Sequence, residues 1–522
     1  MNFWDRIAAE RQLITFSDTP HGPLGLIYPN LYNVGMASLG FQQIYRLFSE
    51  AGISTERIFL DKNENETRSI ENRTPLFRFP ILAATYTYEL DILNLIRMLV
   101  RGGVAPLAEQ RTGDEPLLIV GGQAATANPQ LIERFADVIA LGEGEGLVPP
   151  IAQCLMETEG QPRSARLEAL ANLPHLYVPA VHQAFDPQRM TSHNTDPIDQ
   201  RDCHSVILAD QDEFGGAFLL EMSRGCMYRC KFCIVHYMNG SARYRDADQL
   251  IRVLERHQHG FHKVGLLGAA VADHPRVADV TEWLVDHGKQ VSTSSLRAER
   301  ISERFLDLLR AGGQHNITVA PETGGMSTRK NMRKGIKDEK YFKLAEMVGK
   351  RGFPSMKLYF LIGTPDADPM QEADDIINFG REFFEVFRKA GGGKLTLTVS
   401  PFVPKPTTPW AEAGLWDAKT VKKASRLIRK HLVFRGEIKV PPINIKEARA
   451  ETVLSWSGPE LTDELLRLAQ GEISFESAFK DFDVNQLDRN AQKAILPHQT
   501  VLQYNAKAEA IAQRNKLQAA VR

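Results

Sequence analysis

Three cysteines within eight residues are the clearest sign of chemistry in this sequence. They lie in the stretch Cys226-Met-Tyr-Arg-Cys230-Lys-Phe-Cys233. Three thiolates on one loop can bind three irons of a [4Fe–4S] cluster. The fourth iron of such a cluster stays open to a small ligand with two donor atoms. The spacing therefore predicts an iron–sulfur cluster that binds a ligand at its free iron.

A structural zinc site is the alternative interpretation of the same cysteines. Zinc prefers four ligands, and Cys203 or His236 could complete the set. Neither residue has the spacing to the three cysteines that is typical of zinc ribbons or zinc fingers. The sequence therefore favours the cluster over zinc.

Composition indicates an ordinary globular protein with more than one domain. The chain has 522 residues, of which 43% are hydrophobic and 24% charged, and its formal net charge is −1. This charge gives no global field that would attract nucleic acid or an anionic membrane. We find no secretory signal and no apolar run of transmembrane length. Five cysteines, an odd number, argue against a disulfide framework, so we expect a cytoplasmic protein with reduced thiols.

Alternating strands and helices must position this chemistry, and the first alternation fills the N-terminal part of the chain. Short apolar runs end at Pro or Gly, and each is followed by apolar residues at helical spacing. This pattern predicts a doubly wound parallel sheet whose ligand site lies beyond the carboxyl ends of the strands. The expected strands are 24–29, 57–60, 81–85, 117–120 and 138–141, with helices over about 41–48 and 90–100.

A second alternation carries the cysteines just after its first strand. Six strand–helix units suggest a partial (β/α)6 barrel with its active site at the carboxyl ends of the strands. The expected strands are 218–222, 264–267, 291–294, 317–320, 356–362 and 395–399. We therefore divide the α/β chain into a first domain (1–165), a linker (166–212), a barrel (213–410) and a mixed C-terminal extension (411–522). The extension is expected to end in an alanine-rich helix over 499–522.

The cysteine spacing, with an aromatic residue before the last cysteine, resembles the signature of the radical S-adenosylmethionine (SAM) superfamily. The resemblance implies that the amino and carboxylate groups of SAM bind the open iron. An electron from the cluster then cleaves SAM to a 5′-deoxyadenosyl radical. Phe232 stands where the superfamily has an aromatic residue near the adenine.

Four further positions resemble the SAM contacts of the superfamily. Gly268, after the second strand, would let the methionine amine approach the backbone, and Ser295 and Arg297, after the third, would contact the ribose and carboxylate. A guanidinium suits that carboxylate because its planar fork can bind both oxygens. Glu322, after the fourth strand, would contact SAM or substrate. For Arg297 and Glu322 an ion pair at the barrel rim is an equal alternative.

The first domain resembles the cobalamin-binding domains that precede many radical SAM barrels, and most of the chain is similar to an uncharacterised group of such two-domain proteins. The usual Asp-x-His-x-x-Gly motif corresponds here to Asn30-Leu31-Tyr32-Asn33-Val34-Gly35. Tyr32 replaces the histidine that would bind cobalt, so the protein could bind cobalamin without a protein ligand, bind it with water on cobalt, or use the domain otherwise. The resemblance assigns to cobalamin Tyr32, Gly35, Thr85, Thr87, Gly121, Gly122 and Gly142.

These resemblances imply a cobalamin-dependent methyltransferase that acts on an unactivated carbon of a small molecule or metabolite. A low-potential donor such as flavodoxin or ferredoxin would supply the electron, and no nucleic acid partner is expected. The alternative is a radical SAM enzyme that closes rings, rearranges skeletons or forms C–C bonds without cobalamin. Methylthio transfer to tRNA fits less well because those enzymes carry three more cysteines in the first domain. A non-catalytic cobalamin carrier would need no reducible cluster.

A basic run follows the fourth strand of the predicted barrel. It contains Arg329, Lys330, Arg333, Lys334 and Lys337. Such runs usually form a solvated surface. We expect that here, and a binding site for a phosphate-bearing substrate is the alternative.

Overall fold

A computed structural model describes residues 9–16, 19–61, 66–186, 201–433 and 436–480. The first domain is built on a six-stranded sheet with the order β3-β2-β4-β5-β6-β7. All neighbours are parallel except β6 and β7, which pair antiparallel. The strands are β2 (His21–Tyr28), β3 (Ile53–Phe59), β4 (Ile81–Thr85), β5 (Leu117–Gly121), β6 (Val138–Ala140) and β7 (Leu176–Tyr177). This confirms the predicted doubly wound sheet.

Helices cover the two faces of this sheet unequally. On one face lie α3 (Leu39–Glu50), α6 (Gly144–Glu157) and α7 (Arg163–Ala171), packed on alternate strand residues such as Leu26 and Ile119. On the other face lies α4 (Asp91–Arg101). The strand order reverses between β2 and β4, and ligands bind at such switch points in open α/β sheets.

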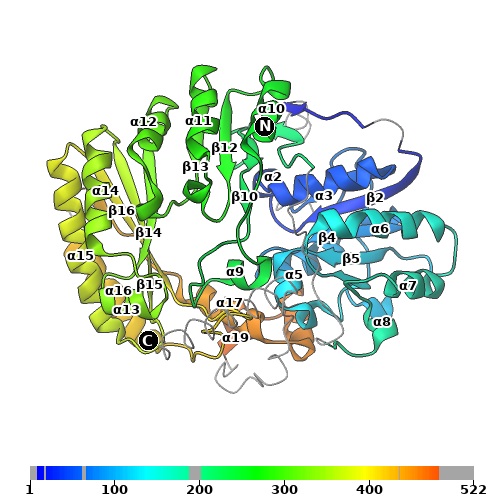
Figure 1. The fold of residues 1–522 in the computed structure, drawn as a ribbon. Helices are drawn as coiled ribbons and strands as arrows, with labels where there is room; N and C mark the ends of the chain where they lie inside the picture. Colours follow the sequence, from blue (N-terminus) through cyan, green and yellow to red (C-terminus); the bar gives the residue numbers. More distant parts are fainter. Residues whose placement is uncertain (1–8, 17–18, 62–65, 187–200, 434–435, 481–522) are drawn as a thin grey trace, which may run out of the picture.

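All six strands predicted for the second domain are present. They form two parallel sheets, β13-β12-β9 and β14-β15-β16-β17, which a parallel bridge between Leu296 and Val319 connects. The strands are β9 (Phe218–Glu221), β12 (Lys263–Leu267), β13 (Gln290–Thr293), β14 (Asn316–Glu322), β15 (Ser355–Ile362), β16 (Lys394–Pro401) and the short β17 (Ile438–Lys439). Helices α10 (Ala247–His257), α11 (Val277–Asp286), α12 (Glu303–Ala311), α14 (Asp338–Lys350), α15 (Pro369–Lys389) and α16 (Ala418–Leu432) flank them (Figure 1).

The C-terminal extension returns to the first domain. Helices α17 (Ile445–Trp456), α18 (Thr462–Gln470) and α19 (Phe475–Lys480) share a hydrophobic core with α4, and Figure 1 shows α17 and α19 in orange beneath the two domains. The Asn128 amide donates to the Ser457 carbonyl at 2.7 Å, and Lys405 pairs with Glu451 at 2.7 Å. The extension therefore ties both α/β domains together. The helix expected over 499–522 lies outside the described residues.

The segment expected to be a linker is partly structured, so the first domain extends beyond residue 165. Strand β7 belongs to the first sheet, and β8 (Ile207–Ala209) pairs with β1 (Glu10–Gln12). A two-residue strand such as β7 carries no periodicity that the sequence could show. Among the described residues, no helix is long and apolar enough to cross a membrane.

Candidate functional site

The three cysteines lie on the loop between β10 (Ser223–Arg224) and α9 (Ile234–Asn239), and none is in a disulfide. The backbone N–H groups of Tyr228 and Val235 lower the pKa of the Cys226 and Cys233 thiols, respectively. Burial raises the pKa of all three thiols, that of Cys233 to about 11. A bound metal reverses this effect because a coordinating thiol is deprotonated. The loop therefore combines soft donors with N–H groups that stabilise thiolate.

The turn before Cys226 accepts only glycine. Gly225 has φ +73°, and a Cβ there would meet the Ser241 carbonyl oxygen at 2.4 Å. The Cys226 N–H donates to the Gly240 carbonyl at 3.1 Å. These contacts fix the first thiol against the end of α9.

The zinc alternative gains no support from the structure. One ring nitrogen of His236 lies 2.7 Å from the Cys226 carbonyl oxygen, and the other accepts a hydrogen bond from Arg229 at 3.1 Å. Cys203 packs with Leu39 and Leu219. Within the described part of the chain, no three His, Cys, Asp or Glu side chains are arranged to hold a single ion. Cluster thiolates can lie farther apart because each binds a different iron. The donor set therefore fits a cluster better than zinc.

Arg297 lies beside the cysteine loop, where the resemblance placed a SAM contact. Its guanidinium carbon stacks 3.4 Å from the centre of the Tyr228 ring. It also pairs with Glu299, and its positive charge lowers the pKa of the Cys230 thiol, which burial raises. Ser295, two residues earlier, is exposed. The loop after β13 thus presents a cation to the cysteine loop and carries an exposed hydroxyl nearby in the sequence.

Phe232 and Gly268 lie at opposite sides of the same loop. Phe232 packs against a small core of Met332, Phe402 and Trp410, and the Trp410 N–H donates to the Lys231 carbonyl at 3.1 Å. A Cβ on Gly268 would meet the Ser223 hydroxyl oxygen at 2.6 Å. Glycine at 268 therefore lets the end of β12 approach the strand that leads into the cysteine loop.

Glu322 is the last residue of β14 and forms an ion pair. Its carboxylate accepts from the Lys334 ammonium at 2.6 Å, and both side chains are buried. Its φ is +66°, which is uncommon outside glycine and is typical of positions that the surroundings enforce.

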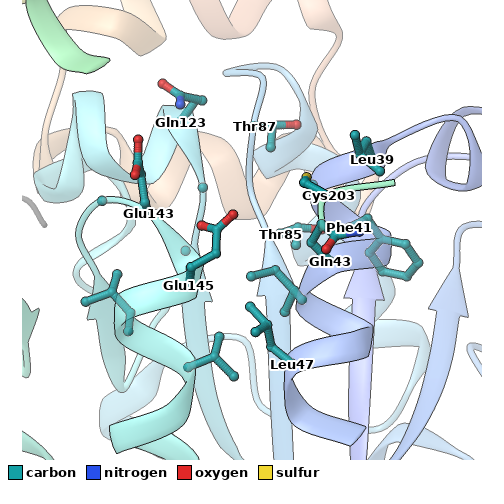
Figure 2. A pocket seen from close by; sticks show the side chains of 18 of the residues that line it. Leu39, Phe41, Gln43, Leu47, Thr85, Thr87, Gln123, Glu143, Glu145 and Cys203 are labelled. Atoms are coloured by element: carbon teal, nitrogen blue, oxygen red, sulfur yellow. The ribbon is translucent and has the colours of Figure 1, made fainter. Parts of the chain in front are cut away.

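A cavity of about 410 Å³ lies between the first sheet and the second domain. Helices α3 and α6 lie side by side on one face of the sheet and form two of its walls (Figure 2). Its floor is made by the small residues Ala83, Gly121 and Ala140 of the middle strands. The apolar wall residues are Phe41, Ile44, Leu47, Phe48, Leu147, Val148 and Ile151.

The upper end of the cavity reaches the segment that precedes the first cysteine. Ser223, Arg224, Gly225, Leu267 and Gly268 all line it. A deep apolar slot in the first domain is therefore continuous with the entrance to the cysteine loop.

Buried ion pairs close this junction between the domains. Arg224 pairs with Glu145 at 2.7 Å and with Glu221 at 2.9 Å, and Arg243 pairs with Glu143 at 2.6 Å. Glu143 and Glu145 stand at the start of α6, above the slot (Figure 2). The network holds the loop after β6 against the strand that leads to Cys226.

Five of the seven residues assigned to cobalamin line this cavity. They are Thr85, Thr87, Gly121, Gly122 and Gly142. Gly122 has φ +117°, and a Cβ there would meet the Tyr86 carbonyl oxygen at 2.5 Å. The glycine pair therefore keeps the mouth of the slot free of side chains.

Tyr32 and Gly35, the other two, are not among the described residues that line the cavity. The Tyr32 hydroxyl donates to Glu10 at 2.5 Å, within a network in which Glu10 also pairs with Arg57 at 2.7 Å. A Cβ on Gly35 would meet the Phe59 ring at 2.4 Å. The short helix α2 (Tyr32–Met36) turns these residues into the protein, where burial raises the pKa of Tyr32.

The sequence did not identify the apolar walls or the ion pairs at the cavity mouth. The walls have the pattern of ordinary core residues, so nothing marks them as lining a cavity. The Glu-Gly-Glu stretch at 143–145 was a detectable sign of charged residues at the cavity mouth. Carboxylates directly after a buried strand lie at the edge of a parallel sheet where ligands bind.

Comparison with known proteins assigns both domains. Residues 40–179 match the family described as "Radical SAM proteins, N-terminal", and residues 220–406 match the radical SAM superfamily. The uncharacterised protein MJ0966 of Methanocaldococcus jannaschii is 25% identical over 459 residues, which cover 88% of this chain and 93% of that protein.

Two solved structures have a similar fold at low identity. The radical SAM methyltransferase TsrM from Kitasatospora setae, with cobalamin and a [4Fe–4S] cluster bound, aligns with a TM-score of 0.57 and 12% identity, covering 87% of this chain and 99% of TsrM. The cobalamin-dependent SAM radical enzyme OxsB, with aqua-cobalamin bound, aligns with a TM-score of 0.52 and 14% identity, covering 88% of this chain and 72% of OxsB. These structures show the fold alone. The two family matches show that the chain is a radical SAM protein, with an N-terminal domain of the kind found in that superfamily.

Proposed function

We propose that this radical SAM enzyme binds cobalamin in its first domain and transfers a methyl group to an unactivated carbon of a small molecule. The observation that carries the proposal is the continuous cavity, which begins between α3 and α6 and ends beside Gly225, the residue before Cys226. A cofactor seated there would meet SAM at the junction of the domains.

The cavity suits the chemistry of cobalamin. The cofactor has a wide corrin ring and a tail that ends in a flat, apolar benzimidazole. The slot between α3 and α6 offers apolar walls for the tail base, and the glycines at 121, 122 and 142 leave room for the ring above it. Of the residues that the structure describes, no histidine lines the cavity. We therefore propose a base-off cofactor with no protein imidazole on cobalt.

The two similar folds support this assignment at the level of architecture. TsrM and OxsB are both described with cobalamin bound, and TsrM is described as a methyltransferase. At 12–14% identity their reactions do not transfer to this chain. The proposal therefore depends on the cavity and the cysteine loop of this protein.

The protein's own part is to hold both cofactors and to exclude water. A bound cluster supplies the electron that cleaves SAM to a 5′-deoxyadenosyl radical, and bound cobalamin supplies the methyl group. Cys226, Cys230 and Cys233 would hold the cluster, and Arg297 would orient the SAM carboxylate. The core around Phe232 closes one side of the loop against solvent. A flavodoxin or ferredoxin would serve as the electron donor.

Arg297→Ala is expected to weaken SAM binding without changing the iron content. Loss of a charged donor to a carboxylate costs about 1.5–3 kcal/mol, which is a ten- to hundred-fold loss of affinity. Equilibrium binding of SAM to the anaerobic protein measures the effect. Arg304→Ala is the matched control, because Arg304 is an exposed arginine that pairs with Glu282 on the outer surface. Equal SAM affinity in wild type and Arg297→Ala would remove Arg297 from the site.

Methyl transfer can be tested before the substrate is known. The reduced, cobalamin-loaded protein is mixed with SAM that carries a labelled methyl group. Transfer of that methyl from the sulfonium leaves S-adenosylhomocysteine, and we expect about one per bound cobalamin. Protein without cobalamin is the control. Bound cobalamin with no S-adenosylhomocysteine would reject the methyltransferase assignment and favour radical chemistry without methyl transfer.

A further inference from the structure

The basic run after β14 is only partly a solvated face: Lys330, Arg333 and Lys337 are exposed, as expected, but Arg329 and Lys334 are buried. Arg329 is fully buried and Lys334 is 8% exposed, whereas Lys337 is exposed. A buried cation is costly unless it is paired and hydrogen-bonded. Both buried cations are therefore expected to have partners in the structure.

Arg329 holds the run in a defined shape. Its guanidinium donates to the Thr323 carbonyl at 2.9 Å and to the Ile336 carbonyl at 2.8 Å, and it pairs with Asp338. The Lys334 N–H donates to the Arg329 carbonyl at 3.0 Å. Arg329 therefore fixes the turn that carries Lys334 against the end of β14.

The same run lies against the cysteine loop. The Lys231 N–H donates to the Met332 carbonyl at 3.0 Å, and the Lys231 ammonium donates to the Asn331 side chain at 2.7 Å. The Cys230 thiol lies 4.0 Å from the carbonyl oxygen of Arg333, the residue before Lys334. Three successive contacts thus place the turn that leads into Lys334 against the loop of the second cysteine.

Lys334 and Glu322 carry opposite charges next to the turn that contacts this cysteine. Lys334 directly follows Arg333, whose carbonyl oxygen lies 4.0 Å from the Cys230 sulfur. The two charges are joined at 2.6 Å and both are buried, so solvent screens them weakly. Glu322 stands at the end of β14 with φ +66°.

We propose that Lys334 tunes the reduction potential of the cluster and that Glu322 positions it and partly offsets its charge. On reduction the cluster gains one electron from the donor and no proton, so its negative charge increases. A buried cation beside one of its thiolates stabilises the reduced form, and local charge is among the factors that set cluster potentials. This inference depends on the assigned cluster but not on cobalamin or methyl transfer.

The test is a redox titration of the cluster in the anaerobic full-length protein, followed by electron resonance without SAM. Lys334→Gln is expected to shift the one-electron equilibrium about tenfold toward the oxidised form, or about 59 mV lower. Glu322→Gln is expected to shift it in the opposite direction. Lys334→Arg keeps the charge and is expected to stay near wild type. Lys337→Gln removes the same charge from an exposed position of the run and is the matched control.

Iron analysis of each variant separates this inference from the cluster assignment itself. If wild type binds no iron, the cluster assignment fails. If iron is bound, an unchanged potential in either Lys334→Gln or Glu322→Gln overturns the inference, as does a shift of the same sign in both. If Lys334→Gln does not retain its cluster, Glu322→Gln still tests the inference, because its reduction potential is expected to be higher than that of wild type.

Discussion

Joint replacement of Cys226, Cys230 and Cys233 with alanine is expected to remove all cluster iron and all reductive cleavage of SAM. Wild-type protein prepared without oxygen should contain about four irons and four sulfides per chain, because three thiolates anchor one [4Fe–4S] cluster. The variant should be colourless. Iron, sulfide and 5′-deoxyadenosine are measured on the same samples.

The two remaining cysteines provide the control for this result. Cys154 lies in α6 and Cys203 lines the cavity, and neither is on the cluster loop. Alanine at either position should leave the iron content unchanged. Loss of iron in Cys203→Ala would instead indicate that Cys203 is a fourth protein ligand and would contradict a cluster with an open iron.

Leu47→Trp is expected to weaken cobalamin binding while the cluster remains intact. Leu47 projects from α3 into the slot between α3 and α6 (Figure 2), so an indole there would occupy the space proposed for the tail base. We expect a loss of cobalamin affinity of about 5- to 150-fold, because an overfilled site costs about 1–3 kcal/mol. Cobalamin per chain is measured from the absorbance spectrum after anaerobic reconstitution, and iron is measured in parallel.

Two control variants are expected to bind cobalamin normally. Val100→Trp adds the same indole at an exposed position of α4, away from the residues that line the cavity, and should bind cobalamin like wild type. Tyr32→Phe should also bind it, because Tyr32 contacts Glu10 rather than the cavity. The bound cofactor should show a base-off spectrum, with no nitrogen splitting from a protein imidazole in the Co(II) state. Normal binding by Leu47→Trp would place the cofactor elsewhere.

The strands were predictable from the sequence because each is a short apolar run that ends at a turn residue. The run 81–85 matches β4, and 356–362 differs from β15 by one residue. The cysteine loop was predictable for a different reason, since its three ligands are close in sequence. Features that depend on local pattern were therefore accessible without a structure.

Features that depend on packing between distant segments were not accessible. The cavity exists because α3 and α6 flank middle strands with small side chains, which no local pattern reveals. Tyr32 was expected at the cofactor because of its place in a motif, yet its hydroxyl meets Glu10, 22 residues earlier. Lys334 looked like a surface residue because it lies in a basic run. Its burial depends on an ion pair with Glu322 on β14, which the sequence does not reveal.

The most direct test of the account is a count of both metals in one sample. Full-length protein is purified and reconstituted without oxygen in the presence of iron, sulfide and cobalamin, and excess reagent is removed. Elemental analysis is then expected to find about four irons and one cobalt per chain. Stoichiometric zinc without iron would contradict the cluster, and four irons without cobalt would contradict the cobalamin site between α3 and α6.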